Sequence, residues 1–505
     1  MPLNEIMALQ QVGFPILTTL ILLPVAAIFA LLVAPVSWSR RVGYVAAALE
    51  LALSVLLVAR FRPGVADMQF VERASWIPTL GVNWHVGVDG ISLLFIPLTC
   101  LLTLLVLIQR APSAKVHPRG WLACMLGLQA ATVGVFAALD LILFFIFWEL
   151  TLIPTFFLVS RWGFGPHRRF AAVKYVVFML VGSAPLLVAN IILGTHAARI
   201  TGNFVGAFDL TALLATPLPV ELQTQVLFLL VLGFAVKAPM FPFHTWLPAL
   251  LLEGPVGIGV FMVGVKLGIY GLVRLAIPLA PDAAREWATA GMAWGLVGVL
   301  YGALVALSQD NLRRMLAFLG VSHVGLMVMG LFSLNVQGVQ GALLVMLNMG
   351  ITSTGLMFLL GALYARTGSS DLTALGGLAR HAPMLTTAFF VLALGSMGVP
   401  GTSGFSSEQV LLLGAFKAHG GWAAAALVGA LVGAAALIWA FQRAFVGPAS
   451  PRRVDDLLPR EKAVAAVLVV LVLALGLHPR PVMETSRAAV DAFHQRLNLR
   501  VTASR

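Results

Sequence analysis

The feature that most constrains this chain is a near-continuous succession of apolar runs, each about as long as a membrane is thick. The 505-residue sequence is 60% hydrophobic and only 10% charged, whereas an average soluble protein has about 25% charged residues. A water-soluble globular fold is therefore excluded. Because nearly every long segment is apolar, we interpret the chain as one unit that crosses the membrane many times.

Windows of about 20 apolar residues predict fourteen membrane-spanning helices. The predicted spans are 14–35, 43–60, 92–110, 120–139, 141–160, 171–194, 225–250, 256–277, 288–307, 315–334, 340–364, 384–413, 421–443 and 462–479. The first span follows a segment, 1–13, without Lys or Arg, and it is too long for the apolar core of a signal peptide. We therefore expect an uncleaved first helix.

Lys and Arg residues are distributed unequally between the two sets of loops. The loops after odd-numbered spans hold eighteen of them: Arg40, Arg41, Arg110, Lys115, Arg119, Arg161, Arg168, Arg169, Lys174, Arg313, Arg314, Arg366, Arg380, Arg443, Arg452, Arg453, Arg460 and Lys462. The opposite loops hold seven: Arg60, Arg62, Arg73, Arg199, Arg274, Arg285 and Lys417. The C-terminal tail adds five to that poorer side. The positive-inside rule makes the richer side cytoplasmic and places both termini outside; nucleic-acid binding is a poor explanation for charge scattered in this way.

The two remaining cations, Lys237 and Lys266, lie inside predicted spans, where acidic residues accompany them. Lys266 is near the middle of the eighth span, and Glu149 is near the middle of LILFFIFWELTLIPTFFLV. Each such charge costs about 2.5–3.5 kcal/mol to insert into a bilayer. We therefore expect these side chains to face protein or enclosed water and to have partners.

Two predicted spans contain residues that break helices. Three prolines follow Lys237 in KAPMFPFHTWLP, and Glu408 follows Pro400 and nearby glycines in LGSMGVPGTSGFSSE. Breaks at membrane depth are tolerated where they line a cavity, and a pair of them five spans apart is typical of inverted-repeat transporters. The fold class that we predict is an all-α membrane protein of about fourteen helices, with inverted five-helix repeats formed by spans 4–8 and 9–13, each containing a broken helix.

This organisation divides the chain into four parts. Residues 1–110 carry the first three helices and an external loop, 111–280 the first repeat, 281–445 the second repeat, and 446–505 a cytoplasmic loop, the last helix and a basic tail.

Two histidines extend the set of polar side chains at membrane depth. His323 lies in the tenth span, and His244 follows Lys237 by seven residues. Imidazole titrates near neutral pH and suits a proton relay. The structural alternatives are that His323 is a hydrogen-bonded packing residue, that His244 satisfies the broken helix, and that Glu149 and Lys237 form an ion pair that only holds helices together.

Other polar residues favour less specific interpretations. Glu50 and Asp140 suggest subunit contact or snorkelling toward the headgroups. Cys100 and Cys124 are the only cysteines, which excludes a disulfide framework and a four-thiolate iron–sulfur cluster. No Gly-rich phosphate loop and no metal-spaced cluster occurs in the sequence, so we expect no cofactor or metal site in this chain.

Seven blocks of the sequence are long, ordered and unlike generic apolar helices. They are GVDGISLLF, FWELTLIPTFFLVSRWG, KAPMFPFHTWLP, KLGIYGLVRL, SQDNLRRMLAFLGVSHVGLMVMG, DLTALGGLARHAPM and GVPGTSGFSSE, between about 85 and 420. The blocks resemble those of the antiporter-like membrane subunits of complex I, the respiratory NADH:quinone oxidoreductase, most closely the subunit M type. The short tail after the last span also suits that type, because the subunit L type continues into a long lateral helix.

The resemblance implies a proton channel in a bacterial inner membrane, in a hetero-oligomer with other membrane-arm subunits. This chain would be a proton-translocating subunit of the oxidoreductase without a redox centre of its own, and NADH, FMN, iron–sulfur clusters and quinone would bind partner subunits. The implied proton-transfer residues are Glu149 paired with Lys237 of the broken helix, Lys266 as the connecting lysine, His323 on the central axis, Glu408 at the exit, and His244 as a candidate relay.

Two departures from the family pattern affect this channel. Where many relatives have Asn-His-Gly, this chain has Asn348-Met349-Gly350, so water or Thr352 would have to bridge. The segment before Lys266 is also two residues shorter than in many relatives. A two-residue deletion in a helix rotates the residues after it by about 200°. Either a helix break absorbs that change or Lys266 faces elsewhere.

Two alternative functions remain open. The same channel could serve a multi-subunit sodium/proton antiporter, a membrane-bound hydrogenase or an ion-coupled carbon-uptake complex, which have related subunits. A non-conducting scaffold that only extends the membrane arm is the other alternative, and Met349 is the residue that favours it.

Overall fold

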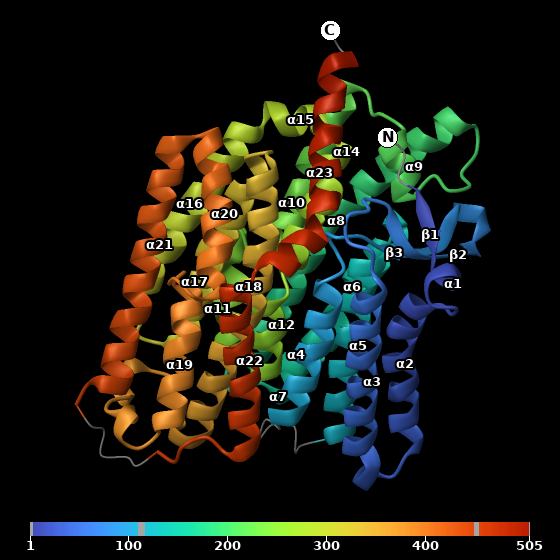
Figure 1. Cartoon of the computed structure of the whole chain (residues 1–505). Helices are drawn as coiled ribbons and strands as arrows, with labels where there is room; N and C mark the ends of the chain where they lie inside the picture. The colour runs from blue at the N-terminus through green and yellow to red at the C-terminus, as the bar shows by residue number, and fades with distance from the viewer. Residues whose placement is uncertain (1–3, 110–116, 449–453, 504–505) are drawn as a thin grey trace.

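The computed structural model describes residues 4–109, 117–448 and 454–503. Figure 1 shows a bundle of helices that run mostly alongside one another, with a small sheet near one end. The N-terminal third contains β1 (Glu5–Met7), α1 (Ala8–Gln11), α2 (Ile16–Val33), α3 (Ser39–Arg60), β2 (Met68–Ile77), β3 (Val82–Val88), α4 (Phe95–Gln109), α5 (Pro118–Ala137), α6 (Leu141–Leu150) and α7 (Leu152–Trp162). The middle contains α8 (Arg168–Thr201), α9 (Leu210–Ala215), α10 (Val220–Lys237), η4 (Phe243–Thr245), α11 (Trp246–Glu253), α12 (Val256–Gly264), α13 (Leu267–Gly271), the π-helix η5 (Leu272–Ala276), α14 (Ile277–Leu279), α15 (Pro281–Glu286) and α16 (Ala288–Leu307). The last part contains α17 (Leu312–Phe332), α18 (Val336–Thr367), α19 (Pro383–Ser396), α20 (Ser403–Ala418), α21 (Gly420–Phe441), α22 (Pro459–Leu477) and α23 (Arg480–Ala503).

The chain is a multi-pass, mostly helical membrane protein. Within the described residues, eleven helical segments are long and apolar enough to cross a membrane, or twelve if the bent pair α22–α23 counts as one. Two shorter apolar helices, α4 and α19, do not reach that length. Helices α17 and α18 are almost completely enclosed by their neighbours, so they form the centre of the bundle.

Both predicted helix breaks are present. Helix α10 ends at Lys237 and α11 begins at Trp246, with the short η4 turn between them. Helix α19 ends at Ser396 and α20 begins at Ser403. The structure adds a third break that we did not predict, between α12 and α13, where Lys266 itself interrupts the helix.

The N-termini of α6 and α17 lie at opposite ends of the bundle and are capped and bridged in the same way. The N-cap side chains Asp140 and Asn311 each accept two hydrogen bonds from the first turn of the helix that comes after them, α6 or α17. Each N-cap also forms an isolated bridge to an aspartate beyond the next long helix, Asp209 or Asp371. The backbone hydrogen bonds correspond as well: Leu141 N to Phe208 O and Leu210 N to Leu139 O in one, Leu312 N to Ser370 O and Leu372 N to Asp310 O in the other.

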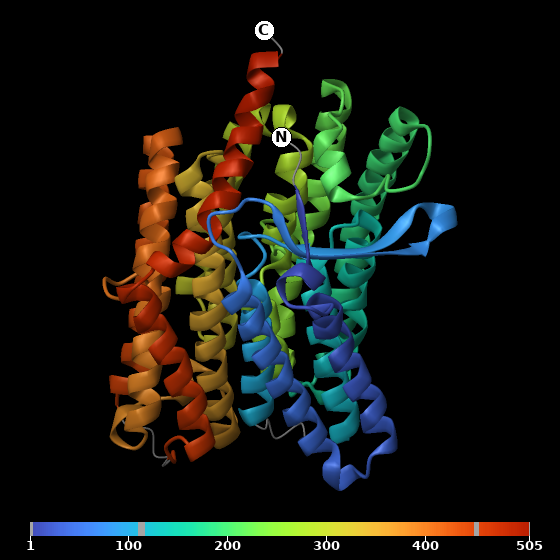
Figure 2. The same cartoon turned by 45° about the vertical axis from the view of Figure 1, so that its right-hand side comes forward.

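A three-stranded sheet departs from the predicted all-α fold. Strand β2 pairs antiparallel with β3 and parallel with β1. The sheet lies near the end of the bundle where both termini are found (Figures 1 and 2). Strands β2 and β3 lie in the segment that we expected to be a loop between the second and third spans, and β1 precedes the first span. Hydropathy windows of helical length do not detect strands of three to ten residues.

The two termini emerge on the same side of the bundle (Figure 2), as an even number of spans requires. Among the cations used to predict topology, Arg110, Lys115, Arg452, Arg453 and Arg505 lie outside the described residues. Arg274 was wrongly assigned to a loop: it is 5% exposed and lies in η5. It had been grouped with the loop cations because it is close to the predicted end of the eighth span at 277, but the helix continues past it to Leu279.

The interpretation of Glu50 and Asp140 as contact or snorkelling residues is wrong for this chain. Glu50 has no exposed surface, and its Oε2 accepts a hydrogen bond from Gln129 Nε2 at 3.3 Å. Asp140 is equally buried because it caps α6 and also accepts a hydrogen bond from Asn83 N. Partners from other elements of the fold, helix α5 for Glu50 and strand β3 for Asp140, explain both positions, and hydropathy does not reveal them.

A hydrogen-bonded network ties β1 to the sheet and gives a pH-dependent prediction. Glu5 Oε1 lies 3.3 Å from His85 Nε2 and accepts a hydrogen bond from Thr211 Oγ1 at 3.0 Å. The hydrogen bond with His85 lowers the pKa of Glu5, although partial burial acts in the opposite direction. A carboxyl whose pKa is lower in the folded state stabilises above its unfolded pKa, about 4.3 for Glu, and loses that contribution as pH falls through the folded value. We expect hydrogen exchange in β1 and β2 to accelerate below about pH 4 and a Glu5→Gln variant to lose this step; equal pH profiles would contradict the prediction.

Candidate functional site

Lys237 marks the end of α10, where the proline-rich segment stops the helix. Its Nζ donates hydrogen bonds to the backbone O of Trp148 at 2.9 Å and to Thr151 Oγ1 at 2.7 Å. The ammonium also lies 4.0 Å from the centre of the Trp148 ring, in cation–π geometry. The α6–α7 junction therefore supplies the partners of this lysine.

Glu149 does not form the predicted ion pair with Lys237 in this structure. Lys237 contacts the residues on either side of the acid, while the Glu149 side chain lines a cavity of about 580 Å³ at the outer surface of the bundle. That cavity is otherwise apolar, and its wall includes the exposed Leu150 and Ile153. Glu149 Oε1 is shielded from solvent and has no hydrogen-bond partner among the described residues.

Lys266 lies at the break between α12 and α13, 3% exposed, and its Nζ has no hydrogen-bond partner within the described part of the chain. Thr354 Oγ1 of α18 is also buried and unpartnered there. A Cβ on Gly264 would lie 2.6 Å from Thr354 Oγ1, so the end of α12 approaches α18 closely. Lys266 therefore lies inside the bundle, at a break in its helix.

The ends of the helices that carry Lys237 and Lys266 are in direct contact. A Cβ on Gly268 would lie 2.5 Å from Ala238 N and 2.6 Å from Phe234 O. Only glycine permits this approach, which places α13 directly against the last turn of α10. The first and second intramembrane lysines are therefore carried by adjoining backbone segments.

His323 and Glu408 are brought together across the second broken helix. His323 Nε2 lies 3.6 Å from Glu408 Oε1, and the two side chains are 9% and 12% exposed. The His323 ring also contacts Leu319 O at 2.8 Å through Nδ1 and Ser396 O at 3.2 Å through Nε2. The break itself makes room for the acid, because a Cβ on Gly398, at φ +68°, would lie 2.5 Å from Glu408 Oε2.

His244 lies in η4, within the first broken helix, and is 3% exposed. Aromatic rings surround it, with ring centres of Tyr301 at 5.0 Å, Phe318 at 5.8 Å and Phe241 at 6.0 Å. Its Nδ1 has no hydrogen-bond partner among the described residues. No contact joins His244 to the other candidate residues there, so the structure does not bring it into their chain.

Met349 is buried in α18 beside several hydrogen-bonded polar side chains. Met349 is 1% exposed, and its Sδ accepts a contact from Ser353 Oγ at 3.6 Å. Asn348 beside it bridges the second broken helix, since its Nδ2 donates to Gly395 O at 3.3 Å and its Oδ1 accepts from Ser403 Oγ at 2.7 Å. Thr352 Oγ1 donates to the Asn348 carbonyl at 2.9 Å. An amide and two hydroxyls therefore continue the polar interior past Met349.

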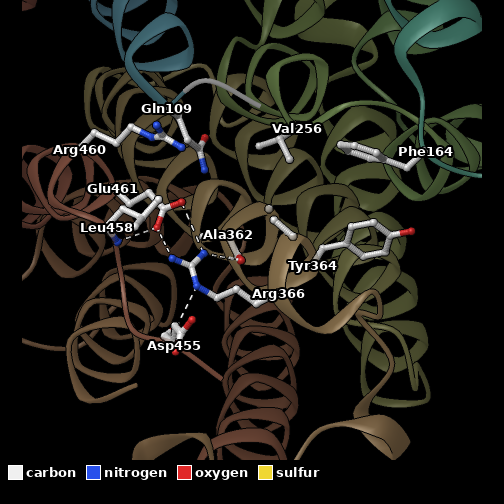
Figure 3. A pocket seen from close by; sticks show the side chains of 12 residues that line it. Gln109, Phe164, Val256, Ala362, Tyr364, Arg366, Asp455, Leu458, Arg460 and Glu461 are labelled. Atoms are coloured by element: carbon white, nitrogen blue, oxygen red, sulfur yellow. Dashed lines mark hydrogen bonds and ion pairs between the residues drawn. The ribbon is translucent and has the colours of Figure 1, made fainter. Parts of the chain in front are cut away.

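A separate pocket of about 510 Å³ lies between the ends of α18 and α22 (Figure 3). Arg366 occupies its centre and donates to Glu461, to the carbonyls of Asp455 and Asp456, and to that of Ala362. All five N–H groups of this guanidinium thus have acceptors. The pocket contains none of the candidate residues, and we interpret it as the joint that holds α22 against α18.

The partners of the candidate residues were not predicted from the sequence. Thr151, Asn348 and Ser403 are neutral residues that hydropathy does not distinguish from other helix-packing positions. Ser403 lies in the predicted break before Glu408, which was the available signal for it, whereas Thr151 and Asn348 lie in spans for which no break was predicted. Among the described residues, no three His, Cys, Asp or Glu side chains gather to hold a metal ion.

Comparison with known proteins gives the family. A model described as "NADH:quinone oxidoreductase/Mrp antiporter, TM" matches residues 138–433, more than half of the chain. The chain belongs to this antiporter-like membrane-subunit family. The family member from Thermosynechococcus vestitus named NAD(P)H-quinone oxidoreductase chain 4 2 is 36% identical, over 96% of this chain and 92% of the relative. NADH-quinone oxidoreductase subunit M of Mycobacterium tuberculosis is 33% identical, over 94% of this chain and 93% of that protein. The resemblance to the antiporter-like subunit M type is confirmed.

Solved structures support the same family membership. A chain of respiratory complex I from Thermus thermophilus with bound NADH has a TM-score of 0.87 at 34% identity, covering 95% of this chain and 99% of that one. A chain of the Mrp complex from a Dietzia species has a TM-score of 0.76 at 22% identity, over 97% and 98% of the two chains. The second likeness shows a shared fold alone.

Proposed function

We propose that this chain is a proton-translocating subunit of the membrane arm of an NADH:quinone oxidoreductase. Its relatives of the subunit M type match nearly the whole chain, and a chain of complex I matches its structure over 95% of its length. As a subunit of that enzyme it would assemble with other membrane-arm subunits in the bacterial inner membrane. Quinone reduction in partner subunits, where NADH, FMN and iron–sulfur clusters bind, would drive the protons.

The observation that carries the proposal is the line of ionisable groups at successive helix breaks. Lys237 ends α10, Lys266 interrupts the eighth span, and His323 contacts Glu408 beside the break between α19 and α20. Membrane charges are costly and default to function. Breaks expose backbone groups that water can use, so each break provides both a titratable group and a place for hydration.

The proposed switch depends on whether the Glu149 side chain points toward the outer cavity or toward Lys237. With Glu149 turned toward the outer cavity, the lysine has only a carbonyl, a hydroxyl and a ring as partners. With Glu149 turned inward, the carboxylate would favour the protonated lysine. Alternation between these positions would load Lys237 and then release its proton toward Lys266, His323 and Glu408. Moving one charge against 100 mV costs about 2.3 kcal/mol, comparable to about two pKa units of electrostatic change at about 1.36 kcal/mol each.

The proposal includes fourteen spans in two inverted repeats. Adding α4 and the α19–α20 pair to the twelve candidates counts fourteen. The Asp140 and Asn311 caps with their matched bridges, at opposite ends of the bundle, support repeats of α5–α14 and α16–α21. The boundaries at residues 110, 280 and 445 between the four parts of the chain follow from these repeats. The distribution of loop cations supports both termini outside.

The family description and the Dietzia fold match favour one second candidate, a subunit of an Mrp-type sodium/proton antiporter. The proteins that co-purify with this chain in mild detergent distinguish the two. Subunits that carry flavin and iron–sulfur clusters would support the oxidoreductase, and their absence from an intact complex would support the antiporter. The scaffold alternative requires that the chain carry no protons.

Proton flux tests the proposed function directly. We expect the complex with Glu149→Gln to translocate protons in reconstituted vesicles about tenfold more slowly than the native complex, because glutamine cannot provide the charge that loads Lys237. The measurement is acidification of the vesicle lumen during NADH oxidation. Glu221→Gln, in the first turn of α10, is the matched control and should pump normally. Full pumping by the Glu149→Gln complex would contradict the switch.

A further inference from the structure

A buried ion pair joins two residues that the proposed proton path does not use, in two different sequence blocks. Asp89 belongs to GVDGISLLF, before α4, and Arg274 belongs to KLGIYGLVRL, in η5. Arg274 Nη1 lies 2.6 Å from Asp89 Oδ2, and the two side chains are 6% and 5% exposed. Removing one partner of such a buried pair leaves an uncompensated charge, so the contact strongly constrains both segments.

The Asp89 end of this pair is anchored independently of Arg274. Asp89 Oδ1 accepts hydrogen bonds from Ile91 N at 2.9 Å and Ser92 N at 3.2 Å. A Cβ on the next residue, Gly90, would lie 2.2 Å from the backbone O of Thr485 in α23. The turn is therefore packed against the C-terminal helix, and Asp89 is a fixed point to which Arg274 is attached.

The Arg274 end belongs to the segment that carries Lys266. Between the break at Lys266 and Arg274 lie α13 and the start of η5. Tyr270, in the same segment, donates a hydrogen bond to Phe136 O of α5 at 3.0 Å. Lys266 Nζ has no hydrogen-bond partner of its own within the described residues, so its direction depends on how the segment behind it is held.

The π-helical geometry makes that direction sensitive to register. A π-helical turn contains an extra residue relative to an α-helical turn, and such bulges are common at functional sites. If η5 returned to α-helical hydrogen bonding, the residues before it would rotate by about 100°, the angle per residue of an α-helix. Lys266, already free at a break, would then turn away from its present environment.

We propose that the Asp89–Arg274 ion pair is a positioning pair that holds the register of η5 and thereby fixes the direction in which Lys266 points. Neither residue touches the moving proton. The consequence for proton transfer rests on the proposed function, whereas the effect on Lys266 orientation does not.

Cysteine labelling tests the orientation without reference to pumping. Lys266→Cys is introduced into the complex with Cys100→Ser and Cys124→Ser, and its reaction rate with a membrane-permeant maleimide is measured with Asp89 or with Asp89→Asn. We expect the rate to change about tenfold, which corresponds to about 1.4 kcal/mol. Val260→Cys, buried on α12 across the break, is the matched control and should keep its rate. An unchanged rate at position 266, or an equal change at both positions, would overturn the proposal.

Two further variants keep the test decisive. Asp89→Glu retains the charge and should therefore keep the native labelling rate. A changed rate in this variant would contradict the proposal. If the Asp89→Asn complex does not assemble, the double variant Asp89→Leu with Arg274→Met removes both charges and leaves none buried without a partner. The same tenfold change of about 1.4 kcal/mol is expected there, and a native rate would overturn the proposal.

Proton counting separates failure of this proposal from failure of the proposed function. In complexes with all native cysteines and Lys266, Asp89→Asn should lower the protons moved per NADH oxidised, and Asp89→Glu should restore them. If Lys266→Ala pumps normally, the proposed proton path fails while the labelling result stands. If Lys266→Ala stops pumping but labelling is unaffected by Asp89→Asn, the positioning pair fails while the path stands.

Discussion

Replacing Lys237 by alanine should abolish proton translocation by the assembled complex while NADH oxidation remains at least partly active. The substitution removes the proposed proton acceptor beside the α6–α7 junction, together with the hydrogen bonds that Lys237 Nζ donates to the Trp148 carbonyl and the Thr151 hydroxyl. We expect a loss of at least about tenfold, or about 1.36 kcal/mol of barrier. The measurement is the number of protons taken up per NADH oxidised in inverted membrane vesicles.

A second substitution at the same position separates charge from proton release. Lys237→Arg keeps a cation, but a guanidinium does not deprotonate in proteins, so we expect this variant to block translocation as well. Lys417→Ala, on the exposed surface of α20, serves as the control for loss of a lysine. Coupled pumping by Lys237→Ala at the native ratio would refute the proposed function.

Replacing Glu408 by glutamine should have the second largest effect. Glu408 lies 3.6 Å from His323 in a nearly enclosed position, and the amide can neither stabilise a protonated imidazole nor accept its proton. We expect proton translocation to fall about tenfold, with assembly unaffected because glutamine is nearly isosteric. Vesicle acidification during NADH oxidation again provides the measurement.

The geometry of the break supplies an independent check on Glu408. Gly398→Ala would place a methyl group 2.5 Å from Glu408 Oε2 and force the carboxyl away from His323 without changing any charge, so it should reproduce part of the same loss. Glu484→Gln, a 53% exposed acid of α23, should behave as the native chain. A Glu408→Gln complex with native pumping would remove this residue from the proton path.

Hydropathy predicted most of the helices because membrane burial requires long apolar runs. The proline- and glycine-rich segments after Lys237 and before Glu408 predicted two breaks correctly, since those residues interrupt helical hydrogen bonds regardless of tertiary contacts. The break at Lys266 contains no proline, and Gly264 and Gly268 on either side of it did not by themselves predict an interruption. Strand β1 pairs with β2, about 60 residues away, which no local pattern encodes, whereas β2 and β3 are neighbours in the chain but are too short for windows of helical length to detect.

The candidate residues were predicted more completely than their contacts. A charged residue in an apolar run indicates a site because inserting the charge into a bilayer costs free energy. On that basis Lys266 was expected to face protein or enclosed water, and it is buried. Its neighbours depend on how helices rotate against each other, so the Glu149–Lys237 pair expected from the resemblance is replaced by backbone and hydroxyl contacts. Asp89 and Arg274 both lie in sequence blocks that carry the family resemblance, but their separation along the chain concealed the pair.

The two halves of the second broken helix, α19 and α20, are both hydrogen-bonded to the Asn348 side chain of α18. Because Asn348 holds Gly395 on one side and Ser403 on the other, the hinge between α19 and α20 is braced from α18, whereas no side chain plays that part for Lys266 within the described residues. We therefore expect the α19–α20 break to keep its shape through direct side-chain contacts, whereas the orientation of the Lys266 ammonium depends on how the helical segments on either side of its break are held.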